Sequence, residues 1–77
     1  MNFDNIVEID TEYIRLDNMM KLAGEVDTGG MAKSIIQAGM VKVNGEVCPM
    51  RGKKMRDGDY YEFDGRSCVL RSSFKEA

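Results

Sequence analysis

The chain contains no histidine and no tryptophan, and only two cysteines and one proline among its 77 residues. Without histidine, a general base that works near neutral pH would have to be a carboxyl, amine or thiol group with a strongly shifted pKa. Cys48 and Cys68 alone cannot provide the four ligands of a structural zinc site. The sequence therefore argues against an enzyme and predicts neither a metal site nor another cofactor.

Signals for a membrane or for export are also missing. The apolar runs are only a few residues long, which is too short to span a bilayer. The first residues carry neither the positive charge nor the apolar stretch of a signal peptide. We therefore expect a cytoplasmic monomer in which Cys48 and Cys68 remain reduced. A chain of this length has room for a single domain, residues 1–77.

The small net charge of −2 conceals an uneven distribution along the chain. Residues 1–31 carry seven acidic and two basic side chains, whereas residues 32–56 carry six basic and one acidic. The local electric field, and not the net charge, attracts a polyanion. The sequence can thus present a basic face although the whole chain is mildly acidic.

The first half of the chain predicts a strand and two helices. Residues 6–14 are rich in β-formers and predict one strand. Apolar residues at helical spacing then predict a helix from Leu16 that ends at Gly24. A second helix is capped by Asp27 or Thr28 and ends at Gly39. Four methionines are expected in the core because they fall at helical or strand periods: Met19, Met20, Met31 and Met40.

The second half predicts a run of strands. Asn44-Gly45 is a strong hairpin signal. A two-residue loop would pair Val43 with Glu46, but a longer loop that pairs Val43 with Val47 keeps one face apolar and is preferred. Residues 51–56 form a basic connection, and strands at residues 59–63 and 67–70 are bounded by turns at Asp57-Gly58 and Asp64-Gly65. The acidic residues here, Asp57, Asp59, Glu62 and Asp64, are assigned to turns and not to a cation site.

This order of elements predicts an α+β domain, with a helix pair packed on one side of a small antiparallel sheet and an extra N-terminal strand. The folded core spans about residues 13–70, and the tail is expected to be flexible from about residue 72. The predicted core consists of Leu16, Met20, Ile35, Ile36, Val41, Val43, Tyr61 and Phe63.

An ordered set of motifs resembles a known family. The set comprises Arg15-Leu16-Asp17, Ala32-Lys33 followed by Ile35-Ile36, the segment Gly39-Met40-Val41-Lys42-Val43-Asn44-Gly45, and Gly58-Asp59 before Tyr61 and Phe63. Over roughly residues 13–63 the chain resembles the S-four domain, the alpha-L RNA-binding motif. It is most similar to short stand-alone bacterial members of the YaaA/YbcJ type, which share Gly29-Gly30-Met31-Ala32-Lys33 and Arg51-Gly52-Lys53-Lys54. The resemblance implies a role in translation or ribosome assembly. Many family members have Ser-Arg where this chain has Gly29-Gly30.

Two segments are candidates for binding RNA. The N-terminus of the second helix, at Thr28, Gly29 and Gly30, offers free amides to a phosphate, and Lys33 adds a charge; the alternative is that the glycines only make a turn. The other segment is the basic connection with Arg51, Gly52, Lys53, Lys54 and Arg56, for which the alternative is a solvated loop. Second-tier candidates are Arg15, Lys21 and Lys42. Tyr60 is expected to be exposed, either as an edge aromatic or as a platform for a base.

We therefore predict non-catalytic binding of structured RNA, either ribosomal RNA, a ribosome-bound RNA or transfer RNA. Contacts with phosphates and with RNA shape would dominate. The alternative is a protein-interaction module that uses the acidic N-terminal third and the methionine-rich helices. Related S-four domains are often fused to enzymes, but this chain is too short to hold a second, catalytic domain.

Overall fold

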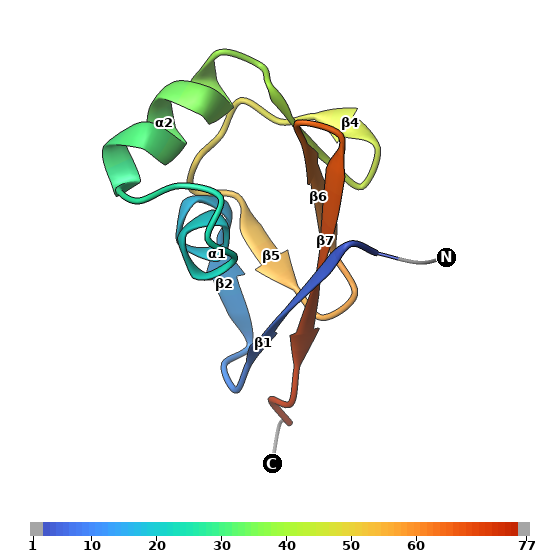
Figure 1. The fold of residues 1–77 in the computed structure, drawn as a ribbon. Coiled ribbons are helices and arrows are strands. Elements are labelled where there is room, and N and C mark those ends of the chain that lie inside the picture. The colour runs from blue at the N-terminus through green and yellow to red at the C-terminus, as the bar shows by residue number, and fades with distance from the viewer. Residues whose placement is uncertain (1–2, 76–77) are drawn as a thin grey trace.

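The computed structural model describes residues 3–75 of the chain. Its helices are α1 (Leu16–Leu22) and α2 (Gly29–Gln37), and its strands are β1 (Asn5–Ile9), β2 (Tyr13–Arg15), β3 (Val41–Val43), β4 (Glu46–Val47), β5 (Lys54–Arg56), β6 (Tyr60–Phe63) and β7 (Arg66–Ser72). Both helices lie on one side of the larger sheet, and α1 packs against α2 (Figure 1). The α+β class is therefore confirmed.

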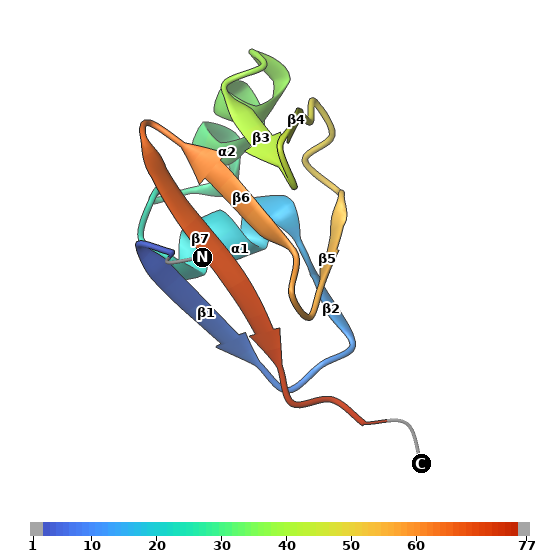
Figure 2. The ribbon, with the colours of Figure 1, turned by 90° about the vertical axis from the view of Figure 1, so that its right-hand side faces the viewer.

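The strands form two sheets. Five strands pair in the order β1-β7-β6-β3-β4, and β2 pairs separately with β5 (Figure 2). The larger sheet is mixed. Strand β1 runs parallel to β7, whereas all other strand pairs of this sheet are antiparallel. The prediction of a purely antiparallel sheet was thus wrong. The helices and other strands lie between β1 and β7 in the sequence, so the chain can return to β1 in parallel.

The predicted strand at residues 6–14 is in fact two strands. β1 ends at Ile9, and β2 begins at Tyr13 in the other sheet. The residues between them, Asp10, Thr11 and Glu12, are all exposed. These polar residues form the corner at which the chain leaves β7 and turns toward β5. The alternation of apolar and polar residues continues across this corner, so the sequence pattern could not show that the strand ends at Ile9.

Helix boundaries agree with the sequence. Thr28 is the N-cap of α2, and its hydroxyl accepts a hydrogen bond of 3.1 Å from the Met31 amide. Gly24 and Gly39 follow the two helices with φ angles of 78° and 79°. This left-handed conformation, which favours glycine, lets the chain end a helix and turn sharply.

The β3–β4 hairpin has the register that we did not prefer. Val43 pairs with Glu46 and Lys42 with Val47, so the loop is Asn44-Gly45 alone. Both loop residues have positive φ, 51° and 91°, as a type I′ turn requires. The strand keeps an apolar face because the amide of Cys48 bonds to the carbonyl of Val41, and both side chains are buried. Val47 is left on the outer face, 55% exposed.

The core lies between the helices and the sheets. Six of the eight predicted members are buried, and Ile35 and Phe63 are partly buried against them. Met19 and Met20 are fully buried, but Met31 and Met40 are 46% and 57% exposed, so their assignment to the core was wrong. Met31 lies in the first turn of α2 and Met40 in the loop after it, where the sheet does not cover them. Cys48 and Cys68 are both buried, and no disulfide joins them in the structure.

Two further segments are more ordered than the sequence indicated. Lys54–Arg56, predicted as part of a connection, is strand β5, with Met55 buried between two exposed basic residues. Ser72, at the predicted start of the tail, is the last residue of β7, and the amide of Ser73 bonds to the Ile9 carbonyl at 3.0 Å. Within residues 3–75, no helix is long and apolar enough to cross a membrane.

Candidate functional site

Helix α1 begins against the basic connection. Its N-cap, Arg15, makes no side-chain capping bond. Instead, the amide of Leu16 donates to the carbonyl of Lys53 at 2.8 Å, and the amide of Asp17 donates to the carbonyl of Arg51 at 3.1 Å. Helix amides that would otherwise lack partners are thus satisfied by main-chain oxygens. These bonds fasten residues 51–53 to the start of α1.

Four basic side chains gather at this junction, and we call them the basic cluster: Arg15, Arg51, Lys53 and Lys54. Arg15 and Lys54 are cross-strand partners in the β2–β5 pair. The guanidinium of Arg15 lies over Gly52, where an added Cβ would be 3.6 Å from Nη2. Arg51 and Lys54 are exposed and Lys53 is half-buried. Such a concentration of positive charge favours contacts with several phosphates.

Asp17 lies under the cluster and was not singled out as a site residue by the sequence. As a whole residue, Asp17 is 6% exposed, less than any other charged residue in the described part of the chain. One carboxylate oxygen accepts from Nη2 of Arg15 at 3.2 Å, and the other accepts from the Asn18 amide at 2.8 Å. The carboxylate therefore holds Arg15 over Gly52 while the guanidinium remains about half exposed.

Tyr13 is a second residue that the sequence did not reveal. The Lys54 ammonium lies 4.8 Å from the centre of its ring, and the Arg56 guanidinium lies 5.5 Å away. Arg56 also forms a 2.9 Å ion pair with Glu12. Arg56 is thus paired with a carboxylate, whereas Lys54 forms no ion pair within the described residues and lies over the aromatic face of Tyr13.

The N-terminus of α2 is open. The helix begins with Gly29 and Gly30, and the Thr28 hydroxyl accepts a hydrogen bond from the amide of the third residue, Met31. The amides of the two glycines are not capped by this bond. Neither glycine has a positive φ, and an added Cβ would meet nothing within 4 Å at Gly29 and only the Thr28 hydroxyl, 3.9 Å away, at Gly30. The turn therefore does not require glycine for steric reasons. Lys33 is exposed one turn further along the helix.

Two predicted candidates lie apart from the basic cluster. Lys42 is on the outer face of β3, in a depression that Asp4, Glu62 and Asp64 also line. Lys21 lies in the last turn of α1, at the other end of the helix from Arg15. Tyr60 is not an exposed platform, because it is half-buried and its ring centre is 5.2 Å from that of Phe3.

A further polar cluster lies beyond the C-terminal end of α1 and includes no predicted site residue. The Glu25 carboxylate, whose side chain is 4% exposed, accepts from Arg66 at 2.7 Å. Beside it, Tyr61 has a fully buried hydroxyl without a hydrogen-bond partner in the described structure. Burial raises the pKa of Tyr61 well above its ordinary value and also raises that of the Cys68 thiol. A thiol held neutral in this way is a poor nucleophile.

Asp57 and Asp59 act as hydrogen-bond acceptors at a turn, as the sequence indicated, whereas Glu62, also assigned to a turn, lies in strand β6. Asp59 accepts from the Arg56 amide at 2.8 Å and from the Asn44 side chain at 3.1 Å. Asp57 accepts from the Ser72 amide at 2.8 Å. In the described range 3–75, no group of three or more carboxylates and thiols is placed to hold a metal ion.

Comparison with known proteins defines the class. The S4 domain, the S-four domain of the sequence resemblance, matches residues 7–71. The chain therefore belongs to the S4 domain family. It is 43% identical over 61 residues to a Bacillus subtilis (strain 168) protein described as "Probable ribosome maturation protein RlbA". The aligned region covers 79% of this chain and 86% of that protein, so the likeness extends over nearly the whole of both.

Proposed function

We propose that the protein binds structured RNA without catalysis, through the basic cluster and the adjacent turn of α1. The observation that carries this proposal is the fastening of residues 51–53 to the start of α1 by main-chain hydrogen bonds. It fixes a basic connection that could otherwise be a solvated loop. Fixed cations lose less conformational freedom when they meet a rigid array of phosphates.

The contacts would be made mainly with the RNA backbone. Arg15 is oriented by Asp17 and Lys54 by Tyr13, while Arg51 is exposed beside them. Such side chains recognise phosphates and the shape of the helix more readily than base edges. The open amides of Gly29 and Gly30 would hold another phosphate, with Lys33 nearby in the helix. Arg56 and Lys42 would contribute less, because each lies among carboxylates.

The RNA would be ribosomal, and the process ribosome maturation. The relative's description supports this choice over transfer RNA, since that protein is described as a probable ribosome maturation protein. Sedimentation of the protein with purified ribosomal subunits, and with bulk transfer RNA as the alternative, tests it. Retention by transfer RNA alone would favour a role elsewhere in translation.

The central experiment is the salt dependence of RNA binding. Neutralising Lys53 and Lys54 together, as Lys53→Gln with Lys54→Gln, removes two phosphate contacts, so the slope of log affinity against log salt falls by roughly 1.4–1.8. A matched control, Lys42→Gln with Lys75→Gln, removes the same charge from outside the cluster and leaves most of the slope. If the first double variant binds a structured RNA hairpin like the parent at about 0.1 M salt, with an unchanged slope, the basic cluster is not the binding site.

A further inference from the structure

β1 forms an open edge of the five-stranded sheet. Its one strand neighbour is β7, to which it runs parallel. The Ile9 carbonyl bonds to Ser73 on the β7 side. Because N–H and C=O groups point to alternate sides along a strand, Asn5, Val7 and Ile9 face β7. The amides and carbonyls of Ile6 and Glu8 therefore face outward, where a further strand could pair with them.

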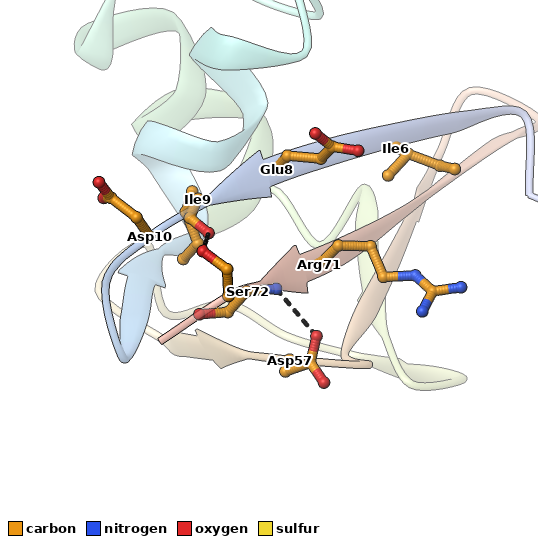
Figure 3. A pocket seen from close by; sticks show the side chains of 8 residues that line it. Ile6, Glu8, Ile9, Asp10, Asp57, Arg71 and Ser72 are labelled. Carbon is orange, nitrogen blue, oxygen red and sulfur yellow. Dashed lines mark hydrogen bonds between the residues drawn. The ribbon is translucent and has the colours of Figure 1, made fainter. Parts of the chain in front are cut away.

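The side chains around this edge have a definite chemistry. Ile6, Glu8 and Asp10 are exposed, and Ile6 leaves 58% of its surface uncovered. Residues of both β1 and β7 line a depression of about 950 Å³ along this strand pair, which Asp57 also borders (Figure 3). Glu8 and Asp10 form no ion pair with any residue in the range 3–75. The one base in the lining, Arg71, points away from Glu8 although the two are register partners (Figure 3).

We propose that β1 is a docking edge for an extended, basic segment of a partner protein, which adds as a strand beside Ile6 and Glu8. Main-chain hydrogen bonds from Ile6 and Glu8 would provide affinity. Alternate lysine or arginine side chains of the segment would meet Glu8 and Asp10, and the aliphatic stem of a third would cover Ile6. This surface carries the charge opposite to that of the basic cluster, so the protein could bind RNA and a basic peptide at the same time.

Charge distinguishes this occupant from a second copy of the chain. Residues 1–31 carry seven acidic side chains and two basic ones. Pairing β1 with β1 of another copy would bring Asp4, Glu8 and Asp10 of both copies into one short ladder, and like charges across a strand pair are destabilising. The same carboxylates repel RNA. A basic extended peptide satisfies both the free backbone groups and the unpaired acids.

The test uses the full chain and a synthetic peptide of alternating lysine and valine, about seven residues long, a length typical of one strand. Titration followed by amide NMR should shift the signals of Ile6 and Glu8 more than those of the basic cluster. The charge-reversal variant Glu8→Lys with Asp10→Lys should weaken binding about tenfold. Ile6→Pro removes one outward amide without removing a bond to β7, and it should abolish pairing at this edge.

Controls separate strand addition from general charge attraction. A peptide of the same sequence in which every amide nitrogen is methylated keeps the charge but has no main-chain donor for the hydrogen-bond ladder, so it should not bind. RNA binding should be unchanged in Ile6→Pro, which makes failure of this proposal distinguishable from failure of RNA binding. Equal binding of both peptides, or of the peptide to parent and both variants, would overturn the proposal. A concentration-dependent dimer that Ile6→Pro dissociates would replace the basic peptide by a second copy.

Discussion

The Asp17 carboxylate lies 3.2 Å from the guanidinium of Arg15, two residues before it in the chain. A buried acid thus orients an exposed base at the start of α1. Because Asp17 also accepts from the Asn18 amide, the same side chain stabilises the first turn of the helix. The pair connects the stability of α1 with the direction in which Arg15 presents its charge.

Replacing Asp17 should therefore weaken both stability and RNA binding. Asp17→Ala leaves the Asn18 amide without its partner and frees Arg15, which should cost about 1–2 kcal/mol of unfolding free energy. Asp17→Asn keeps an acceptor and should lose less. Urea denaturation measures the first effect and titration with an RNA hairpin the second. As a control, the exposed Glu46→Ala should change neither; an RNA affinity unaffected in Asp17→Ala would show that the orientation of Arg15 is irrelevant.

The two glycines at the start of α2 allow stability and binding to be separated. Gly29→Ala and Gly30→Ala introduce a Cβ into open space at helical φ, so each should stabilise the protein by about 0.4–1 kcal/mol. If a phosphate approaches these amides closely, the same methyl groups should lower RNA affinity. Thermal unfolding and RNA titration would be compared for each variant. Alanine variants that are more stable and bind RNA with undiminished affinity would remove this helix end from the interface.

The buried pair of Tyr61 and Cys68 should make the protein sensitive to alkali. Both groups have raised pKa values, mainly through burial, so the unfolded chain loses their protons at lower pH than the folded protein does. The ordinary pKa values are 9.0 for the Cys68 thiol and 10.0 for the Tyr61 hydroxyl. The stability that each buried group contributes is complete below its ordinary pKa and is lost as the pH rises beyond that value. Urea midpoints measured between pH 7 and pH 11 should fall above about pH 9.

Tyr61→Phe isolates the hydroxyl. Because this group is buried without a partner, its removal should leave stability at pH 7 unchanged or raise it by up to about 1 kcal/mol. The fall at high pH should become shallower, with the remaining decrease due to Cys68. A loss of more than about 2 kcal/mol at pH 7 would mean that the hydroxyl makes a bond that the structure does not show.

The ion pair of Glu25 and Arg66 should show an asymmetric response to mutation. Arg66→Met leaves the buried Glu25 carboxylate without its partner, whereas Glu25→Gln leaves the more exposed guanidinium in contact with water. The urea midpoint should therefore fall further for Arg66→Met than for Glu25→Gln. Equal midpoints in the two variants would contradict the asymmetric burial.

The sequence predicted the backbone correctly at positions where the chemistry of a single residue determines its conformation. Thr28 caps α2 and the glycines after each helix adopt positive φ, as their chemistry requires. The hairpin was mispredicted although its turn residues were recognised, because Val47 was assumed to be buried. In fact Cys48 closes the apolar face, and β4 lies at the sheet edge where an exposed valine is tolerated.

Other features depend on contacts between distant parts of the chain. The sequence of β5 predicts a basic loop, because its single buried residue, Met55, is flanked by Lys54 and Arg56. Nothing local shows that Tyr13 lies beneath these two cations or that Asp17 is buried beside Arg51. Those contacts arise when β2 pairs with β5, more than thirty-five residues away. The basic run was visible in the sequence, but the groups that orient it were not.

The bonds from Leu16 to Lys53 and from Asp17 to Arg51 join main-chain atoms only. Their formation does not depend on which side chains occupy positions 51 and 53, provided that the backbone can adopt the same path. The side chains of the proposed RNA-binding surface can therefore change without a change of fold. New charges, amides or aromatic groups at these two positions would extend from the same fixed backbone. Selectivity for a different RNA could thus be acquired by substitution at the surface while the fold is retained.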